Sequence, residues 1–158
     1  MSGGLSHMDD QGAAHMVDVG AKEVTERQAV AEGKVRASDE LLDAIEANSL
    51  HKGNLLDTAR LAGIQAAKRT AELIPLCHPL PLDHVNVEAW VERPYVMLKA
   101  TVRATARTGV EMEALTAVSV AALTVYDMGK SLDKGMVVSA VRLLHKSGGR
   151  SGEWKAPE

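Results

Sequence analysis

Residues 108–134 read TGVEMEALTAVSVAALTVYDMGKSLDK, and this stretch decides how the rest of the chain can fold. It contains no proline and is rich in alanine and leucine, so we predict one long helix from about Val110 to Leu132. At 100° per residue its polar side chains fall on one narrow stripe: Glu113, Thr116, Thr124 and Asp127, with Ser119 and Lys130 at its edge. The chain is too short to cover such a helix on all sides, so we expect part of the apolar surface to contact another subunit.

A charge cluster lies at the end of this helix. The spacing of Asp127, Lys130 and Lys134 sets one carboxylate beside two ammonium groups. Such a cluster can mark an active site, but lysines in a last turn also complement the helix dipole, and spacing alone favours surface decoration. Glu113 shares the stripe fourteen positions earlier, about 21 Å away at 1.5 Å per residue. Both ends can act on one substrate only if it is long or if two subunits share the site.

Length and composition narrow the class of protein. The 158 residues favour one domain, and the absence of a transmembrane run or signal peptide leads us to expect a cytoplasmic protein with no membrane partner. Cys77 is the only cysteine, which excludes an internal disulfide and a CxxC metal site. A net charge of -3 argues against a nucleic-acid partner. With no phenylalanine and few other aromatic residues, the protein should recognise a heterocyclic ligand mainly by hydrogen bonds and charge.

The remaining patterns predict the order of elements. Residues 1–14 and 147–158 read as flexible tails around a single catalytic α+β domain at 15–146. We predict helices at 41–48, after the N-cap Ser38, and at about 54–73, ended by Pro75. Strands are predicted for MVDVG at 16–20, for 27–37 with an interruption at Gly33, for a hairpin at 84–92 and 95–107, and for 136–147. This order is typical of a ferredoxin-like split βαβ sandwich, an antiparallel sheet with helices on one face.

Two loops attract attention. Residues 74–84 read IPLCHPLPLDH, and their three prolines hold His78 on a stiff, non-helical segment that suits either substrate contact or a plain connector. A metal site from His78, Asp83 and His84 is disfavoured because the prolines remove the helical spacing of a zincin. The glycines between Lys146 and Arg150 and just beyond could wrap a phosphate, but they lack the P-loop spacing, so a flexible terminus is favoured.

The charged residues indicate a class of chemistry. Neither a P-loop, a Rossmann glycine motif nor a GxSxG elbow is present. What remains is a set of cations with one histidine and three carboxylates: Lys52, Lys68, Arg69, Lys130 and Lys134, with His78, Glu111, Glu113 and Asp127. Cations suit an anionic, phosphorylated ligand, and a lysine beside an aspartate can move protons. The residues alone therefore indicate acid-base or phosphoryl chemistry on a small phosphorylated molecule.

Four longer strings carry a family resemblance between His15 and Gly152: HMVDVG, HKGNLLDTARLAGIQAAKRTAELIPLCHPLPL, TGVEMEALTAVSVAALTVYDMGKSLDK and VRLLHKSGGRSG. They closely resemble the cyclic pyranopterin monophosphate synthase family of molybdenum cofactor biosynthesis. The resemblance implies a lyase that converts 3′,8-cyclo-7,8-dihydro-GTP to cyclic pyranopterin monophosphate and pyrophosphate. It also implies a homohexamer, a trimer of dimers with active sites between subunits, no tightly bound cofactor, and Mg²⁺ as a possible companion of the triphosphate.

The resemblance assigns roles to individual residues. Asp127 matches the active-site aspartate of the family, and five positions match residues that bind substrate: Leu76, Cys77, His78, Met112 and Glu113. Lys52, Lys68 and Lys130 match basic site residues. We therefore expect Asp127, Lys130 and Lys52 to act in catalysis, and we add Arg69, Glu111 and Lys134 as substrate contacts. In this hypothesis Lys52, Lys68 and His78 hold the triphosphate, and Glu113 accepts N–H donors of the ring. A non-catalytic oligomeric scaffold and a metal-dependent phosphohydrolase are the two rival classes.

Overall fold

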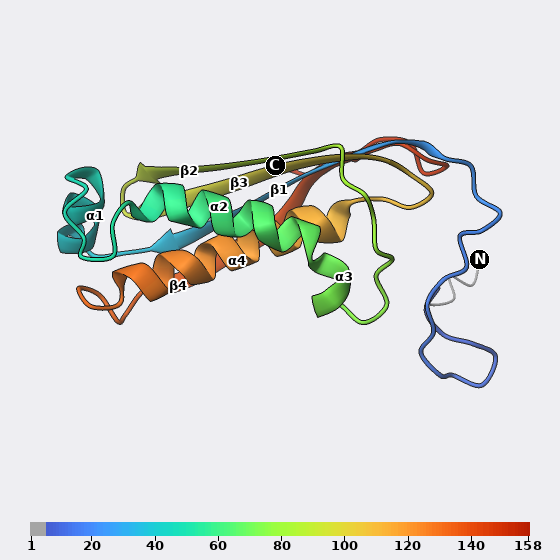
Figure 1. The fold of residues 1–158 in the computed structure, drawn as a ribbon, viewed down its shortest axis with the longest axis horizontal. Coiled ribbons are helices and arrows are strands. Elements are labelled where there is room, and N and C mark those ends of the chain that lie inside the picture. The colour runs from blue at the N-terminus through green and yellow to red at the C-terminus, as the bar shows by residue number, and fades with distance from the viewer. Residues whose placement is uncertain (1–5) are drawn as a thin grey trace.

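The computed structural model describes residues 6–158, which form one antiparallel sheet with helices on one face (Figure 1). In chain order the elements are β1 (Thr25–Arg36), α1 (Asp39–Glu46), α2 (Leu55–Lys68), α3 (Thr70–Leu73), β2 (His84–Glu92), β3 (Tyr95–Ala106), α4 (Glu111–Gly129), β4 (Val137–Ser147) and β5 (Trp154–Lys155). The strands lie in the order β2-β3-β1-β4-β5. Without β5 this is the arrangement of a split βαβ sandwich, so the predicted α+β fold class is confirmed.

Strand β1 lies in the interior of the sheet, between β3 and β4. It pairs with β3 along its whole length, over 12 residues. Its pairing with β4 contains two shifts of register, one of them at Gly33. A Cβ atom at Gly33 would lie 3.2 Å from a methyl carbon of Val141, so a larger residue would push the strands apart there. The glycine thus marks an irregularity in the β1–β4 pairing and does not interrupt β1 itself, which corrects the predicted break.

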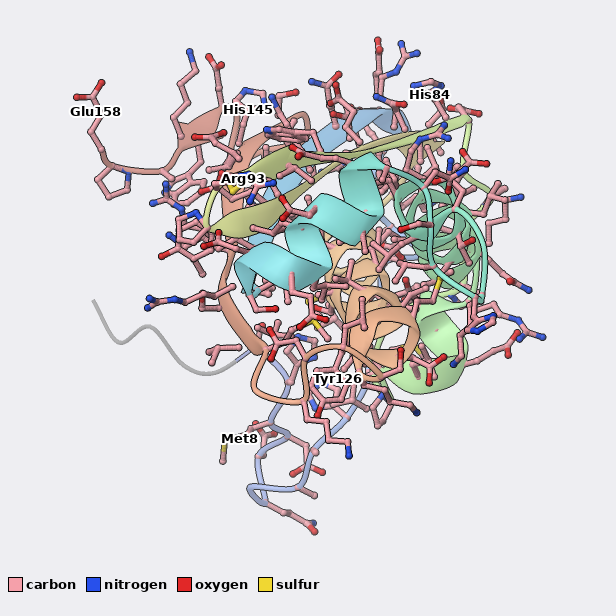
Figure 2. The ribbon with its side chains drawn as sticks, turned by 90° about the vertical axis from the view of Figure 1, so that its left-hand side faces the viewer. Met8, His84, Arg93, Tyr126, His145 and Glu158 are labelled. Carbon is pink, nitrogen blue, oxygen red and sulfur yellow. The ribbon has the colours of Figure 1, made fainter. Side chains whose placement is uncertain are left out.

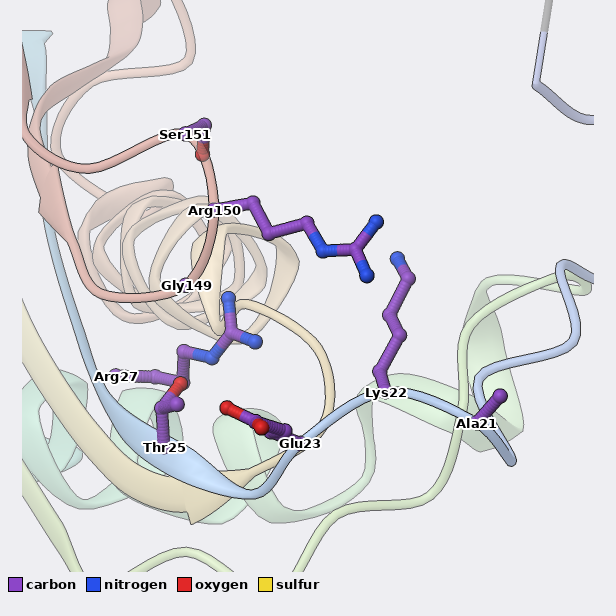
Figure 3. Close-up of a pocket in the computed structure, with 8 residues that line it drawn as sticks. All are labelled: Ala21, Lys22, Glu23, Thr25, Arg27, Gly149, Arg150 and Ser151. Atoms are coloured by element: carbon purple, nitrogen blue, oxygen red, sulfur yellow. The ribbon is translucent and has the colours of Figure 1, made fainter.

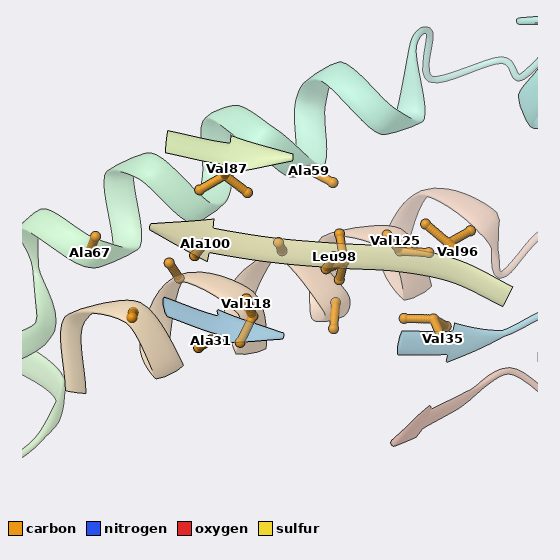
Figure 4. Close-up of a cluster of buried hydrophobic side chains, with 14 of the residues drawn as sticks. Ala31, Val35, Ala59, Ala67, Val87, Val96, Leu98, Ala100, Val118 and Val125 are labelled. Atoms are coloured by element: carbon orange, nitrogen blue, oxygen red, sulfur yellow. The ribbon is translucent and has the colours of Figure 1, made fainter. Parts of the chain in front are cut away.

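Helix α4 packs on the sheet beside α2, and the two helices cover the same face of the sheet (Figure 4). Its inward surface is built from small residues, and Ala114, Ala117, Ala121 and Ala122 are all fully buried. Helix α2 approaches equally closely, since a Cβ atom at Gly63 would lie 3.0 Å from the carbonyl oxygen of Ala117. Small side chains on both helices therefore set a short distance between them. The predicted long, mostly buried helix is confirmed, although it ends at Gly129 and not at Leu132.

Part of the apolar surface of α4 faces solvent. Leu123 is 62% exposed, in contrast to the fully buried alanines of the same helix. A contact of this surface with another subunit stays a prediction.

The predicted helix at 54–73 is two helices. Asn54 caps α2 through its side-chain oxygen, which accepts a hydrogen bond from the backbone N–H of Asp57 at 2.9 Å. The helix breaks at Arg69, and the short α3 follows. Thr70 is buried, and its hydroxyl donates to the carbonyl oxygens of Ala66 and Ala67 at the end of α2. Leu73, at the end of the predicted helix, is 58% exposed because α3 turns away after this break.

Both ends of the chain differ from the prediction. Residues 16–20 form no strand, and within residues 6–14 Met8 and Ala14 pair across a turn in which Asp9 accepts two backbone N–H groups. The first part of the predicted N-terminal tail, residues 1–5, lies outside the described residues. At the other end, Trp154 and Lys155 pair with β4 as β5. The last residues thus add a strand to the sheet.

Arg93, at the turn between β2 and β3, ties that turn to α1 (Figure 2). Its guanidinium group lies 2.6 Å from Asp43, 2.8 Å from Glu46 and 3.3 Å from Asp39. All three carboxylates belong to the helix that the Ser38 side chain caps, as predicted. Sequence reasoning did not connect Arg93 with α1, because the pairing joins segments about fifty residues apart.

The core predicts a clear difference between two leucines. Leu98 of β3 is fully buried, whereas Leu61 of α2 is 59% exposed. Leu98→Ala should lower the free energy of unfolding by about 2–5 kcal/mol, because it leaves a cavity, and Leu61→Ala should change it by less than about 0.5 kcal/mol. Urea denaturation of both variants measures the two effects. Equal losses would contradict this placement of the core.

Candidate active site

An exposed cluster of charges lies at the C-terminal end of α4. Asp127 stands on the last turn of the helix, and Lys130 follows it three residues later as the C-cap residue. Lys52 lies on the loop between α1 and α2. Its ammonium group lies 3.0 Å from one carboxylate oxygen of Asp127, and that of Lys130 lies 2.8 Å from the other. Lys52 also donates a hydrogen bond to the backbone carbonyl of Asp127 at 3.2 Å.

The two lysines fix the charge state of Asp127. Hydrogen bonds and charge from Lys130, then Lys52, lower the pKa of Asp127 to about 2. In return, Asp127 raises the pKa of Lys130. Asp127 is therefore an anion and Lys130 a cation across the neutral range. The cluster offers ammonium groups as proton donors, held in place by one carboxylate.

Lys134 is not part of this ion pair. Because α4 ends at Gly129, the helical spacing that would place Lys134 beside Lys130 does not apply. In the described part of the chain, Asp127 pairs with Lys52 and Lys130. The backbone carbonyl of Lys134 accepts a hydrogen bond from the Tyr126 hydroxyl at 3.0 Å, which anchors the loop after the helix.

A cavity of about 280 Å³ lies at the opposite end of α4. We call it the ring cavity. The proline loop contributes one wall and the first turn of α4 another, and the segment before β1 covers a third side. Its lining includes Leu76, Cys77, His78, Leu80, Thr108, Gly109, Glu111, Met112 and Glu113, with Ser6, His7, Val17, Val19 and Lys22 from the N-terminal segment. The loop and the helix turn that the sequence singled out separately thus meet at one place.

The carboxylates of the ring cavity differ in their surroundings. Glu111 is paired with Lys146 of β4 at 2.8 Å. Glu113 is only 4% exposed, and burial, followed by the charge of Glu111, raises the pKa of Glu113 to about 7, although a bond from its own backbone N–H acts in the other direction. Burial, and then the charge of Glu113, also raises the pKa of the Cys77 thiol. Cys77 is thus a neutral thiol and not a nucleophile at neutral pH.

A larger cavity of about 640 Å³ adjoins the ring cavity and carries positive charge. We call it the basic cavity. Lys22 lines both cavities, and Figure 3 shows Lys22 and Arg150 reaching toward each other across the opening, with Arg27 below them. Arg27 is held by hydrogen bonds to the carbonyl oxygens of Ala106 and Arg107. Three cations against one carboxylate, Glu23, make this cavity suited to an anion such as a phosphate chain.

The two ends of α4 cannot meet on one small molecule within a single chain. Glu113 lies in the first turn and Asp127 in the last, and the straight-line rise between them is about 21 Å. The ring cavity and the Asp127 cluster are therefore two separate candidate sites on each chain.

Comparison with known proteins places this geometry in a family. Residues 16–149 match the model of the MoaC family. The chain belongs to the MoaC family. A protein of Novosphingobium aromaticivorans is 57% identical over 154 residues, which cover 98% of both chains, and bears the name cyclic pyranopterin monophosphate synthase. Proteins with the same name from a Roseiflexus species and from Dinoroseobacter shibae are also 57% identical and cover 95% and 97% of this chain.

The structure groups most of the residues that the sequence of this MoaC-family chain indicated. Leu76, Cys77, His78, Glu111, Met112 and Glu113 line the ring cavity, and Lys52, Asp127 and Lys130 form the opposite cluster. Lys68 lines two other hollows, one of which also includes Glu113. Arg69 lies 3.9 Å from Glu72 in an exposed pair and belongs neither to the ring cavity nor to the Asp127 cluster.

Lys22 and Arg27, which line the basic cavity, were not among the predicted site residues. Neither belongs to a local motif, because the basic cavity is assembled from the segment before β1 and the loop before β5. The available signal was the glycine run that was weighed as a phosphate loop. Gly149 has φ +75, and a Cβ atom at that position would run into the Arg27 guanidinium group. The run thus lets the loop pack directly against Arg27, in a manner unlike a P-loop.

Among residues 6–158 no group of three or more His, Cys, Asp or Glu side chains is arranged to hold a metal ion. In the same part of the chain, no helix has the length and apolar character needed to cross a membrane.

The Asp127 cluster predicts a specific pH behaviour. Because the pKa of Asp127 is lowered to about 2, its carboxylate should stay ionised above about pH 4, and the stability it contributes should be lost only as the pH falls from about 4 through 2. Carbon-13 NMR of the Asp127 carboxyl group, from pH 8 downward, measures this. Replacing both Lys52 and Lys130 by methionine should move the titration into the ordinary aspartate range. A wild-type midpoint near 4 would contradict the ion-pair geometry.

Proposed function

We propose that this chain is a cyclic pyranopterin monophosphate synthase. The reaction converts 3′,8-cyclo-7,8-dihydro-GTP to cyclic pyranopterin monophosphate and pyrophosphate, an early step of molybdenum cofactor biosynthesis. The observation that carries the proposal is the near full-length similarity, 57% over 98% of both chains, to a protein of that name, together with a ring-sized cavity opening onto a cationic one. In this proposal the two cavities bind the ring and the triphosphate, and the Asp127 cluster transfers protons.

The two adjoining cavities suit the two parts of the substrate. The guanine-derived ring fits the ring cavity, where Glu113 faces its N–H donors and Met112 and Leu76 supply apolar contact. The triphosphate extends into the basic cavity, toward Lys22, Arg27 and Arg150. This placement differs from the hypothesis that Lys52, Lys68 and His78 hold the triphosphate. The new placement is supported by the ion pair of Lys52 with Asp127, because the Lys52 ammonium group already has an anionic partner.

The Asp127 cluster suits proton transfer to the reacting ring. Asp127 remains an anion and holds two ammonium groups, Lys52 and Lys130, which in this proposal donate protons to nitrogen or oxygen atoms of the bound substrate. Ring opening needs a proton on the departing nitrogen, which Lys130 provides in this proposal. Formation of the cyclic phosphate then expels pyrophosphate, whose charge is neutralised by the cations of the basic cavity.

The same proposal includes an oligomer. One chain presents its ring cavity and its Asp127 cluster about 21 Å apart, so a complete site arises where the cavity of one subunit meets the cluster of another. A homohexamer, arranged as a trimer of dimers, provides such interfaces. The exposed Leu123 on α4 is an apolar contact available to a neighbouring subunit.

The proposal includes no resident cofactor. A Mg²⁺ ion bound to the triphosphate would enter and leave with the phosphates as part of the substrate. The proposed location is the cytoplasm, which is supported by a single, unpaired cysteine.

Turnover of prepared 3′,8-cyclo-7,8-dihydro-GTP tests the function. We expect the wild-type protein to release pyrophosphate and the pterin product together. Asp127→Asn should reduce the rate by about 10²-fold or more, because it removes the charge that holds both lysines, while the oligomer stays intact in size-exclusion chromatography. No product from well-folded wild-type protein would favour the scaffold class. Activity that chelation abolishes and a divalent ion restores, with phosphate as the product, would favour the phosphohydrolase.

Removing a cation from the basic cavity should weaken substrate binding and leave the chemical step nearly unchanged. Lys22→Met keeps the aliphatic chain and removes the charge, so we expect KM to rise about tenfold with a small change in kcat and a weaker dependence on salt. Lys155→Met is the matched control, since Lys155 is exposed and pairs with Glu153 outside the cavity. A fall in kcat at unchanged KM in Lys22→Met would contradict the phosphate assignment.

A further inference from the structure

Glu113 is a buried carboxyl group without a cation to neutralise it. It stands on the first turn of α4, is 4% exposed, and lines both the ring cavity and a hollow of about 320 Å³ under the proline loop. Among residues 6–158 the structure gives it no ion-pair partner, whereas its neighbour Glu111 is paired with Lys146 at 2.8 Å. A carboxylate removed from water without a counter-charge is destabilised relative to the neutral acid.

The groups around Glu113 do not supply the missing charge. Its own helix contributes Glu111, which is a like charge. The proline loop contributes the half-buried Cys77 and His78, and β4 contributes Lys146, whose ammonium group is bound to Glu111. The remaining charged or titratable groups at the two hollows come from the N-terminal segment and from α2 and α3: His7, Lys22, Lys68 and Glu72. None of these makes an ion pair with Glu113 in the described part of the chain.

These surroundings place the ionisation of Glu113 in the neutral range. Burial is the larger cause and the charge of Glu111 the smaller, and together they raise the pKa of Glu113 to about 7. At pH 7 about half of the empty sites would then carry the protonated acid.

A ring edge with N–H donors would change this balance. A carboxylate can accept two parallel N–H groups, whereas a protonated acid presents an O–H that competes with one of them. Two N–H donors bound to Glu113 would stabilise the charged form and lower its pKa. Binding and ionisation are therefore coupled at this residue.

We propose that Glu113 holds a proton in a large share of the empty sites at neutral pH and releases it to solvent when a ring edge carrying adjacent N–H donors binds. The O–H bond of the carboxyl group breaks, the proton passes to buffer, and both oxygens accept N–H groups of the ring. Glu113 thereby selects for rings that present two N–H donors, because two hydrogen bonds are needed to offset the free energy of ionising a buried carboxyl group. The second half of this inference rests on the proposed function, which supplies a guanine-derived ring; the first half does not.

Titration of the ligand-free protein tests the first half. Carbon-13 NMR of glutamate carboxyl groups should show one resonance with a midpoint of about pH 7, absent from Glu113→Gln and retained in Glu72→Gln. Glu72 is a suitable control because it faces the same hollow but is exposed. A Glu113 midpoint in the ordinary range, about 4 to 5, would overturn the inference whatever the substrate.

The pH dependence of KM for 3′,8-cyclo-7,8-dihydro-GTP tests the second half. Below pH 7 the wild type and Glu72→Gln should show KM rising up to about tenfold per pH unit, because a proton competes with the ring. Titration of the substrate phosphates affects all variants alike. Glu113→Gln should therefore lack this component while binding more weakly throughout.

An identical pH profile in Glu113→Gln would overturn the coupling. Absence of turnover by the wild type would contradict the proposed function and the coupling with it. The NMR titration would still decide whether the empty site holds a neutral acid.

Discussion

The burial of helix α4 in the core fixes the distance between the ring cavity and the Asp127 cluster. The helix runs for 19 residues beside α2 on one face of the sheet, and its small buried residues let it pack closely against its neighbours. Glu113 and Asp127 are thereby held about 21 Å apart on one chain. The helix that organises the core therefore also separates the two candidate sites of each chain, and the proposed pairing of subunits follows from this length.

The two ends of α4 use the same chemical group in opposite ways. Asp127 is exposed and held by two ammonium groups, so its pKa falls to about 2 and it serves as a permanent anion. Glu113 has no ion-pair partner within residues 6–158, and burial raises its pKa to about 7, so it can change charge in the neutral range. Environment and not residue type separates a structural charge from a titrating one, as expected for paired functional carboxyl groups.

Local patterns in the sequence predicted the elements whose causes are local. The apolar run of α4, the alternation of β2 and β3, and the Ser38 cap each depend on neighbouring residues, and each is found in the structure. The break after Lys68 was missed because it involves a buried threonine that bonds back to α2, which the sequence pattern does not reveal. The strand predicted at 16–20 was wrong because that segment instead runs past the ring cavity.

The candidate site was predictable only in part. The resemblance pointed to the proline loop, the first turn of α4 and the Asp127 cluster, which the structure places as two groups. Lys22 and Arg27 were beyond sequence reasoning because the basic cavity joins segments more than a hundred residues apart, whereas Arg150 borders the glycine run that was weighed as a phosphate loop. Lys134 was assigned to the cluster by helical spacing, which fails because the helix ends first.

Subunit complementation tests most directly whether two chains build one site. The Glu113→Gln and Asp127→Asn variants are each expressed alone as the two parents. They are also co-expressed with different affinity tags, so that mixed oligomers can be purified. If each site takes Glu113 from one chain and Asp127 from another, both parents turn over much more slowly than wild type at substrate concentrations below KM, and random mixing restores about a quarter of wild-type turnover under the same conditions. Mixed oligomers no more active than their parents would contradict a site shared between the two ends of α4.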